Sequence, residues 1–401
     1  MSTTLPGKEI CPLKRLVRVF AVSLITLAGL GLVLAAYMVG LSNKNAAERD
    51  FISYWSAGQL IVHHQNPYDG PAVRALELAA GREPSVPTLI MRNPPVAFFL
   101  VVPLGFAAPK ASLILWLLFL LAALLLASFL IWRLHGKPDS LIHLLGFAFA
   151  PVLACLMAGQ FGILLMLGVL LFLTLYRDWP LLAGAGLLLC ALKPHFFVPF
   201  GVALILWSFG NKRGHRVAAG FCAALAASCA FAVFVDPHAF AQYSQFAKGG
   251  AALNDVVPTL GAQLRLLIDP RAVWIQFFPE ALACFWAAWY FFTRRARWDW
   301  ADHGMVLLLV GAICTPYGFF TDEALLLPAV LAGLYRQLDS SRAVSHPRLW
   351  PLLVFAAAAL AELMMNVPIV STGYLWTTPA WLGWYLYATG RLSRQPLPIA
   401  A

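Results

Sequence analysis

The chain has 401 residues, of which 61% are hydrophobic and only 11% are charged. This composition excludes an ordinary soluble globular protein and is typical of a chain with many membrane-spanning helices. The formal net charge of +10 does not indicate nucleic-acid binding, because Lys and Arg fall in short groups between apolar runs, as in membrane proteins. Composition leaves a transporter and a membrane enzyme equally open.

The first apolar run covers residues 16–40 and predicts an uncleaved membrane-spanning helix with its N-terminus in the cytoplasm. Further candidate spans are residues 93–107, 111–133, 141–158, 161–176, 180–193, 195–210, 216–235, 272–292, 301–316, 322–336, 349–366 and 373–390. We therefore expect an all-α polytopic membrane protein with about 11–13 transmembrane helices. No composition shift divides it, so residues 1–401 are predicted to form a single integral membrane domain.

Basic clusters predict which ends of these helices face the cytoplasm. The clusters occupy residues 212–216, 294–297, 336–348 and 391–394. Counting helices from them places the long loop 235–270 on the extracytoplasmic face, and the basic residues at the N-terminus independently place the long loop 41–92 there. One conflict remains, because Arg133 to Lys137 would also lie outside if both 93–107 and 111–133 cross the membrane. A re-entrant 93–107 segment would remove the conflict, and the sequence leaves both possibilities open.

The first long loop contains the stretch "RDFISYWSAGQLIVHHQNPYDG", residues 49–70. Its apolar spacing predicts an interfacial helix with Trp55 at the level of the lipid headgroups. Asp50 opens this helix. It can be an N-cap, which accepts hydrogen bonds from the first amides, or a general base at the membrane surface. One role does not exclude the other.

The motif Asp50-x-x-x-Tyr54-Trp55-x-Ala57-Gly58, followed by Asn66-Pro67-Tyr68-Asp69, resembles the first-loop signature of glycosyltransferase family 87, a family of the GT-C superfamily. Four later stretches are similar to the family in the same order: residues 92–118 with Pro94-Pro95, 158–175 with Gly159-Gln160, 183–194 with Lys193-Pro194, and 315–330 with Asp322. The chain departs from the family pattern at His64, Gln65, Asn93 and Tyr317. These departures bear on which sugar and which acceptor the protein uses, more than on the class of enzyme.

The resemblance implies a GT-C type bundle and an inverting transfer of a hexose, most often mannose, from a polyprenyl monophosphate sugar. The acceptor would be a hydroxyl of a lipid or glycan on the extracytoplasmic face, with Asp50 as the general base. It further implies a multi-pass protein of a bacterial inner membrane. The donor arrives as a lipid-linked substrate, so no cofactor is expected. His63, His64 and Asp69 lack the spacing of a metal site, and no metal ligand is predicted.

A phosphate leaving group requires positive charge, and Lys193, Arg92 and His195 are the candidates, in that order. The alternatives are lysine and arginine side chains that reach lipid headgroups, and a buried histidine. Candidate sugar or acceptor residues are Tyr54, Trp55, Gln160, Tyr317 and Asp322. For Gln160 a helix-packing role is equally open, and for Asp322 a capping role.

A secondary transporter or a lipid or glycolipid flippase is the alternative function. Such proteins have paired halves and an ionisable residue at mid-membrane. Glu362, within an apolar run, is the one convincing charge of that kind, and no paired halves are evident. The chain also lacks the G-x-x-x-x-G-K-[ST], H-E-x-x-H and G-x-S-x-G motifs, which argues against nucleotide-driven transport, zinc proteolysis and serine hydrolysis.

Overall fold

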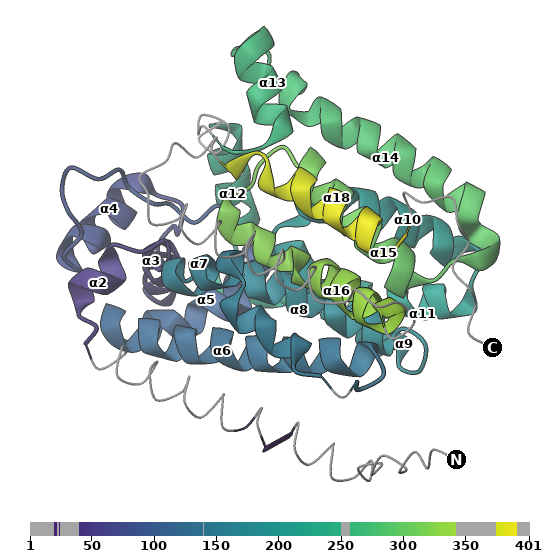
Figure 1. The fold of residues 1–401 in the computed structure, drawn as a ribbon. Helices are drawn as coiled ribbons and strands as arrows, with labels where there is room; N and C mark the ends of the chain where they lie inside the picture. Colours follow the sequence, from purple (N-terminus) through teal and green to yellow (C-terminus); the bar gives the residue numbers. More distant parts are fainter. Residues whose placement is uncertain are drawn as a thin grey trace, which may run out of the picture.

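The computed structural model describes residues 40–138, 140–249, 257–341 and 374–390, together with residues 20, 21 and 24. Within these ranges every regular element is a helix, which confirms the all-α class (Figure 1). Most of the predicted first span, the 349–366 span and Glu362 lie outside the described residues.

The first part of the fold comprises α2 (Asn43–Ala47), α3 (Phe51–Val62), α4 (Gly70–Ala79), η1 (Pro95–Ala97), α5 (Phe98–Val101), η2 (Val102–Phe106), α6 (Pro109–Leu134), η3 (Ile142–Ala148), α7 (Ala150–Ala158) and α8 (Gly162–Leu175), where η denotes a short 3-10 helix. The middle part comprises α9 (Pro180–Gly186), η4 (Leu187–Leu192), η5 (Pro194–Phe197), α10 (Val198–Phe209), α11 (Lys212–Val235), α12 (Ala239–Lys248) and α13 (Leu260–Ile268). The last part comprises α14 (Trp274–Arg294), η7 (Arg295–Arg297), α15 (Trp300–Cys314), η8 (Phe320–Leu326), α16 (Leu327–Ser341) and α18 (Thr377–Ala388).

Basic residues from distant parts of the chain gather at one end of the helix bundle, which we call the basic end. Arg177 forms an ion pair with Asp299 at 3.1 Å, which joins the end of α8 to the start of α15. Arg336 of α16 pairs with Asp302 of α15. The His135 ring, directly after α6, lies 4.4 Å from a ring of α16. Helices α6 and α8 therefore end at the basic end, α15 begins there, and the later part of α16 lies there.

The segment Pro95–Phe106 does not run to the basic end. Before it, Asn93 donates to the carbonyl of Leu192, at the opposite end, over 2.8 Å. After it, the Lys110 amide at the start of α6 donates to Asn43 of α2 over 3.0 Å. Both ends of the segment lie at the same end of the bundle, so the segment folds back. This removes the conflict found in the sequence, because the end of α6 then carries Arg133 and Lys137 to the basic end.

Helix α3 is not on the surface, contrary to the prediction of an interfacial helix. Trp55 is only 6% exposed, and its indole N–H donates to the Ala107 carbonyl over 2.9 Å. Gly58 of α3 lies directly against Gly105 of η2. A Cβ on Gly58 would lie 2.2 Å from the Val101 carbonyl oxygen. The two backbones therefore pack against each other without side chains between them, as small residues permit in helix pairs.

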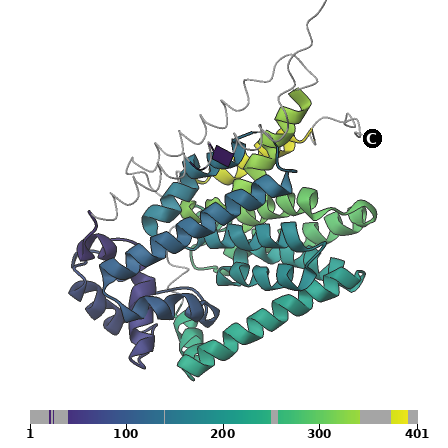
Figure 2. The same ribbon diagram turned by 90° about the horizontal axis from the view of Figure 1, so that it is seen from below.

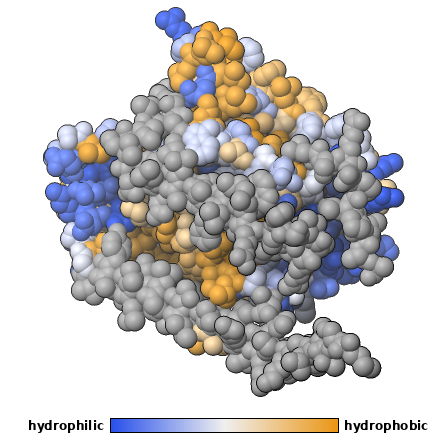
Figure 3. Space-filling view, in the orientation of Figure 1, coloured by the Kyte–Doolittle hydropathy of each residue, from blue (hydrophilic) through white to orange (hydrophobic). Residues whose placement is uncertain are grey.

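Two described helices, α6 and α11, are long and apolar enough to cross a membrane. Seen from below, α6 runs obliquely across the molecule, and both views place α2, α3 and α4 at the end where α6 begins (Figure 2). Several other predicted spans are divided into short helices, such as η3 with α7 and η4 with α9. On the surface, hydrophilic residues gather at the left and right edges and hydrophobic residues cover α13 and α14 (Figure 3).

Candidate active site

A cavity of about 420 Å³ lies at the end of the bundle opposite the basic end, which we call the site end. Seven of the nine predicted site residues line it. They are Asp50, Tyr54, Arg92, Gln160, Lys193, His195 and Tyr317. Residues that the sequence did not single out for the site complete the wall: Ser53, Leu89, Ile90, Asn93, Pro94, Leu192, Pro194, Tyr243, Phe277, Pro316 and Phe319.

The cavity lies where helices are interrupted. Gly159 ends α7 with φ 73°, a left-handed conformation that glycine adopts without a steric penalty. A Cβ there would lie 2.8 Å from the Cβ of Phe51 in α3. The chain then passes through Gln160 before α8 begins at Gly162. A second break follows Leu192, where Lys193 separates η4 from η5 and Pro194 begins η5. Polar side chains at these breaks point into the cavity instead of into a helix surface.

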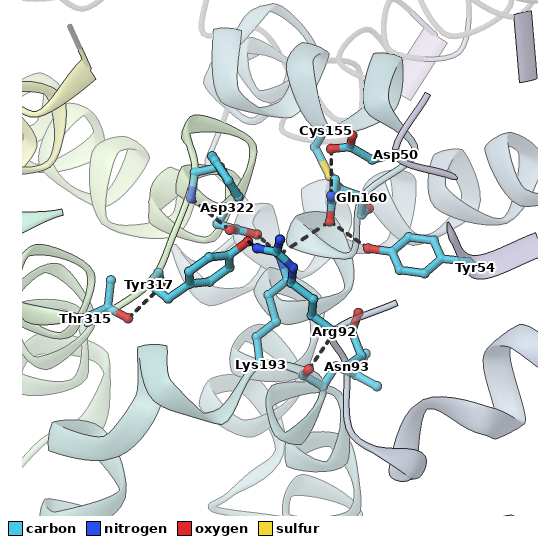
Figure 4. A network of polar contacts seen from close by, with 12 residues as sticks. Asp50, Tyr54, Arg92, Asn93, Cys155, Gln160, Lys193, Thr315, Tyr317 and Asp322 are labelled. Carbon is cyan, nitrogen blue, oxygen red and sulfur yellow. Dashed lines mark hydrogen bonds and ion pairs between the residues drawn. The ribbon is translucent and has the colours of Figure 1, made fainter. Parts of the chain in front are cut away.

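Gln160 is the centre of a polar network that Figure 4 shows at close range. Its Nε2 donates to Asp50 Oδ2 over 2.8 Å. Its Oε1 accepts from the Tyr54 hydroxyl over 2.6 Å and from Lys193 Nζ over 3.4 Å. These partners fix the orientation of the amide, because two donors face its oxygen and a carboxylate faces its nitrogen. The role of Gln160 is thus to connect the carboxylate to the lysine.

Asp50 stands at the N-cap position of α3, but its side chain does not cap the helix. Among the described residues, no amide of α3 donates to the carboxylate, and the backbone at Asp50 is already helical, with φ −59° and ψ −25°. The carboxylate is half-buried and turns to Gln160 instead. The capping interpretation is therefore wrong for the side chain. Asp50 lines the cavity, and Gln160 contacts its Oδ2.

Lys193 is buried and forms an ion pair with Asp322, with Nζ and Oδ1 2.6 Å apart. The other carboxylate oxygen of Asp322 accepts from the Phe319 amide over 3.1 Å. Asp322 therefore does not cap a helix that starts at Ala324, as the sequence suggested; it lies inside η8, accepts from the amide at the start of that helix, and also forms the ion pair. Because a carboxylate neutralises Lys193 directly, this lysine offers less positive charge to a phosphate than the sequence suggested.

Arg92 lies across the cavity from Asp50 and contacts Tyr317. Its guanidinium donates to the Tyr317 hydroxyl, with its carbon 5.4 Å from the centre of the ring. The main chain at this point is held by Tyr68, whose hydroxyl donates to the Asn93 carbonyl over 3.1 Å. Burial raises the pKa of Tyr68 above its ordinary value, so the hydroxyl keeps its proton and remains a donor. Tyr68 of the Asn-Pro-Tyr-Asp motif thereby holds the main chain next to Arg92.

His195 lies at the edge of the cavity, with its ring 6.0 Å from the ring of Tyr317. Its Nε2 is buried and has no hydrogen-bond partner among the described residues. Trp55, by contrast, packs against η2 and lies outside the cavity wall. Among the described residues there is no group of three or more His, Cys, Asp or Glu side chains that could hold a metal ion.

No sequence pattern indicated Tyr243 or Phe277 as site residues, because both come from distant segments that only the fold brings to the cavity. Tyr68 and Asn93 stood inside recognised motifs, but nothing in the motifs indicated which carbonyls they contact. Only their position in the sequence could have indicated a role at the site. Each motif has a polar side chain next to proline, where a helix cannot continue.

The pattern of glycosyltransferase family 87 matches residues 92–316, more than half of the chain. The protein belongs to this family and is a membrane glycosyltransferase. The matched range includes Arg92, Gln160, Lys193 and His195, whereas Asp50 and Tyr54 precede it. Neither the curated proteins nor the solved structures provide a match.

Proposed function

We propose that the protein transfers a hexose, most often mannose in this family, from a polyprenyl monophosphate sugar to a hydroxyl of a lipid or glycan. The observation that carries the proposal is the network along one cavity wall, in which Gln160 joins Asp50 to Lys193. A candidate base and two cations thus border the same space. The family supports the transferase class, and the geometry supports the roles.

In the proposed reaction, Asp50 is the general base. The acceptor hydroxyl donates to the Asp50 carboxylate, most directly to Oδ1, because Gln160 occupies Oδ2. As the hydroxyl oxygen attacks C1 of the sugar, its proton passes to Asp50 and the bond from C1 to the phosphate oxygen breaks. The electron pair of that bond leaves with the prenyl phosphate. Attack from the side opposite the phosphate inverts the configuration at C1.

Arg92 is the first candidate for holding the leaving phosphate, ahead of Lys193. The guanidinium lines the cavity and is only half-buried, whereas Lys193 is buried and paired with Asp322. An arginine can also bind phosphate oxygens through two parallel N–H groups. We assign Lys193 to the orientation of Gln160, and we place His195 and Tyr317 beside the phosphate. Asp322 acts through Lys193.

The size of the cavity fits a single sugar and its phosphate better than a long oligosaccharide. About 420 Å³ is in the lower part of the range for small-molecule sites, roughly 300–1,000 Å³. The prenyl chain would then lie outside the cavity, along apolar helix surfaces within the bilayer. We further propose that the site end faces the extracytoplasmic side of a bacterial inner membrane. The basic end would face the cytoplasm, and the all-α bundle would span the membrane many times.

The test is an incubation of the purified protein with polyprenyl-phosphate mannose and an extract of membrane glycolipids. Mass spectrometry should show an acceptor that has gained one hexose. Parallel reactions with polyprenyl-phosphate glucose and with a polyprenyl diphosphate sugar define the donor. If no donor yields a product but the protein moves a prenyl-linked sugar across proteoliposomes intact, the alternative of a flippase is correct and the transferase proposal fails.

A further inference from the structure

The second loop region, which we define as residues 235–249 and 257–276, has no role in the proposed chemistry, yet part of it lies behind one wall of the cavity. That wall is Pro316 and Tyr317, and Tyr317 contacts Arg92. Helix α13 belongs to this region and packs against α14, as the upper part of Figure 1 shows. The side chains at the junction of α13 and α14 contact the chain next to Tyr317, so they can influence the position of Tyr317.

Two side chains from this junction donate to one carbonyl. Gln276 Nε2, in the first turn of α14, donates to the Pro316 oxygen. Thr259 Oγ1, at the N-cap of α13, donates to the same oxygen over 3.3 Å. Both side chains are buried, and Gln276 is fully so. A carbonyl oxygen has two acceptor positions, and both are occupied here.

The position of Gln276 is itself fixed by the contact between the two helices. Gly261 of α13 packs on the backbone of α14 so closely that a Cβ would lie 2.0 Å from the Gln276 carbonyl oxygen. The next residue of α14, Phe277, lines the cavity. The first turn of α14 is thus held between α13 on one side and the site on the other.

A purely structural role does not require an amide at this position. Burial of an amide costs free energy unless it is hydrogen-bonded, and an apolar residue of similar volume would fill the space without that cost. The amide points at the peptide bond that precedes Tyr317, and Tyr317 in turn accepts from Arg92.

We propose that Gln276 is a positioning residue for donor binding. Through the Pro316 carbonyl it fixes the Tyr317 hydroxyl, and through that hydroxyl it orients the Arg92 guanidinium toward the leaving phosphate. The inference rests on the proposed function, since it takes Arg92 as the group that binds the phosphate of the donor. It gives the second loop region a part in donor recognition.

The first test compares Gln276→Met with Gln263→Met. Gln263 belongs to the same region, but its amide donates to the Val257 carbonyl and not to Pro316. Loss of one positioning hydrogen bond should raise KM for the prenyl-phosphate sugar about three- to tenfold in Gln276→Met. KM for the acceptor should stay within about twofold. The Gln263→Met variant should leave both constants unchanged. An equal rise of both constants in Gln276→Met would overturn the inference.

The second test is a double-mutant cycle with Tyr317→Phe, which removes the hydroxyl that contacts Arg92. If Gln276 acts through Tyr317, Gln276→Met should have little further effect on donor KM in the Tyr317→Phe background. Additive effects would show that Gln276 acts elsewhere and would overturn the inference while the transferase function stands. A wild-type protein that transfers no sugar would instead refute the proposed function, and the inference with it.

Two variants of Thr259 test the inference even if Gln276→Met does not fold. Thr259→Val removes the second donor to the Pro316 carbonyl at nearly constant volume, whereas Thr259→Ser retains the hydroxyl. Donor KM should rise in the valine variant and return to the wild-type value in the serine variant. A serine variant as impaired as the valine variant would refute a role for the hydroxyl.

Discussion

The two regions that flank the cavity at the site end differ in how they are built. In the first loop region, residues 41–92, nearly every side chain of α3 is buried. In the second loop region, Leu267 and Ile268 are 83% and 66% exposed. The first region holds the candidate base and is packed as a core. The second region contacts the cavity wall at Pro316 through hydrogen bonds from Thr259 and Gln276. The candidate base is thus placed on the more tightly packed of the two supports, as a catalytic group would require.

A buried ion pair reinforces this difference. Glu77 of α4 is fully buried, with Arg82 Nε and Arg74 Nη1 each 3.6 Å from its Oε2. Its other oxygen accepts from the Leu89 amide over 2.9 Å, and Leu89 lines the cavity. The first loop region therefore connects a charged cluster to the cavity wall, whereas the second uses the neutral side chains of Gln276 and Thr259.

The largest effect is expected at the base itself. Asp50→Asn should lower kcat about 10²- to 10⁴-fold, the usual contribution of general base catalysis. The unfolding temperature should not fall, because the carboxylate does not cap α3 and an asparagine oxygen can still accept from Gln160. The matched control is Asp69→Asn, an exposed carboxylate of the same region. An Asp50→Asn enzyme as active as the wild type would remove Asp50 from the mechanism.

The next effect is on stability in the first loop region. Glu77→Ala leaves Arg82 buried without its carboxylate, which typically costs about 3–5 kcal/mol of unfolding free energy. Glu48→Ala is the control, because Glu48 is exposed and its 3.8 Å pair with Lys44 should contribute at most about 1 kcal/mol. Thermal unfolding of both variants in the same detergent measures the difference. Equal losses would mean that the Glu77 cluster is not a structural centre of the region.

Glycine contacts allow the two regions to be compared with the same substitution. Gly58→Ala places a Cβ against the Val101 carbonyl and should lower the unfolding free energy by about 1–3 kcal/mol. Gly261→Ala meets the Gln276 carbonyl at a similar distance, but α13 has more freedom to move outward, so the loss should be smaller. Gly201→Ala, with no atom within 4 Å of its Cβ, should not destabilise. A larger loss for Gly261→Ala than for Gly58→Ala would reverse the comparison.

The smallest effect is expected at the exposed tip of α13. Leu267→Ala should change the unfolding free energy by no more than about 0.5 kcal/mol, since the side chain is 83% exposed. Chemical unfolding of the detergent-solubilised protein measures it. A loss above about 1 kcal/mol would indicate that another surface covers this tip.

Many residues of the candidate site could be predicted from the sequence because they stand at helix breaks. Gly159-Gln160 and Lys193-Pro194 interrupt apolar runs, and an interrupted run must satisfy its polar groups within the protein. The sequence could therefore identify the residues and place them on one face. It could not pair them, because Lys193 and Asp322 are 129 positions apart, and their ion pair is the reason that we propose Arg92 ahead of Lys193 as the phosphate-binding group.

The error on α3 has a similar origin. The spacing of its apolar residues predicted the helix, but an apolar stripe with Trp55 is compatible with either a lipid surface or a protein interior. Gly58 and Gly105 decide between them, since their backbones can touch only if α3 packs against η2. Contacts between residues nearly fifty positions apart leave no local pattern in a sequence.

The sequence by itself determined the helical class, the family and most of the polar residues at the site, because hydrophobic runs and their interruptions are local properties of the chain. Only the tertiary structure decided that 93–107 folds back, that α3 is buried, that Asp322 neutralises Lys193, and that Gln276 lies behind Tyr317. These depend on which segments pack together, and in a chain so rich in similar apolar helices many pairings satisfy the same local pattern.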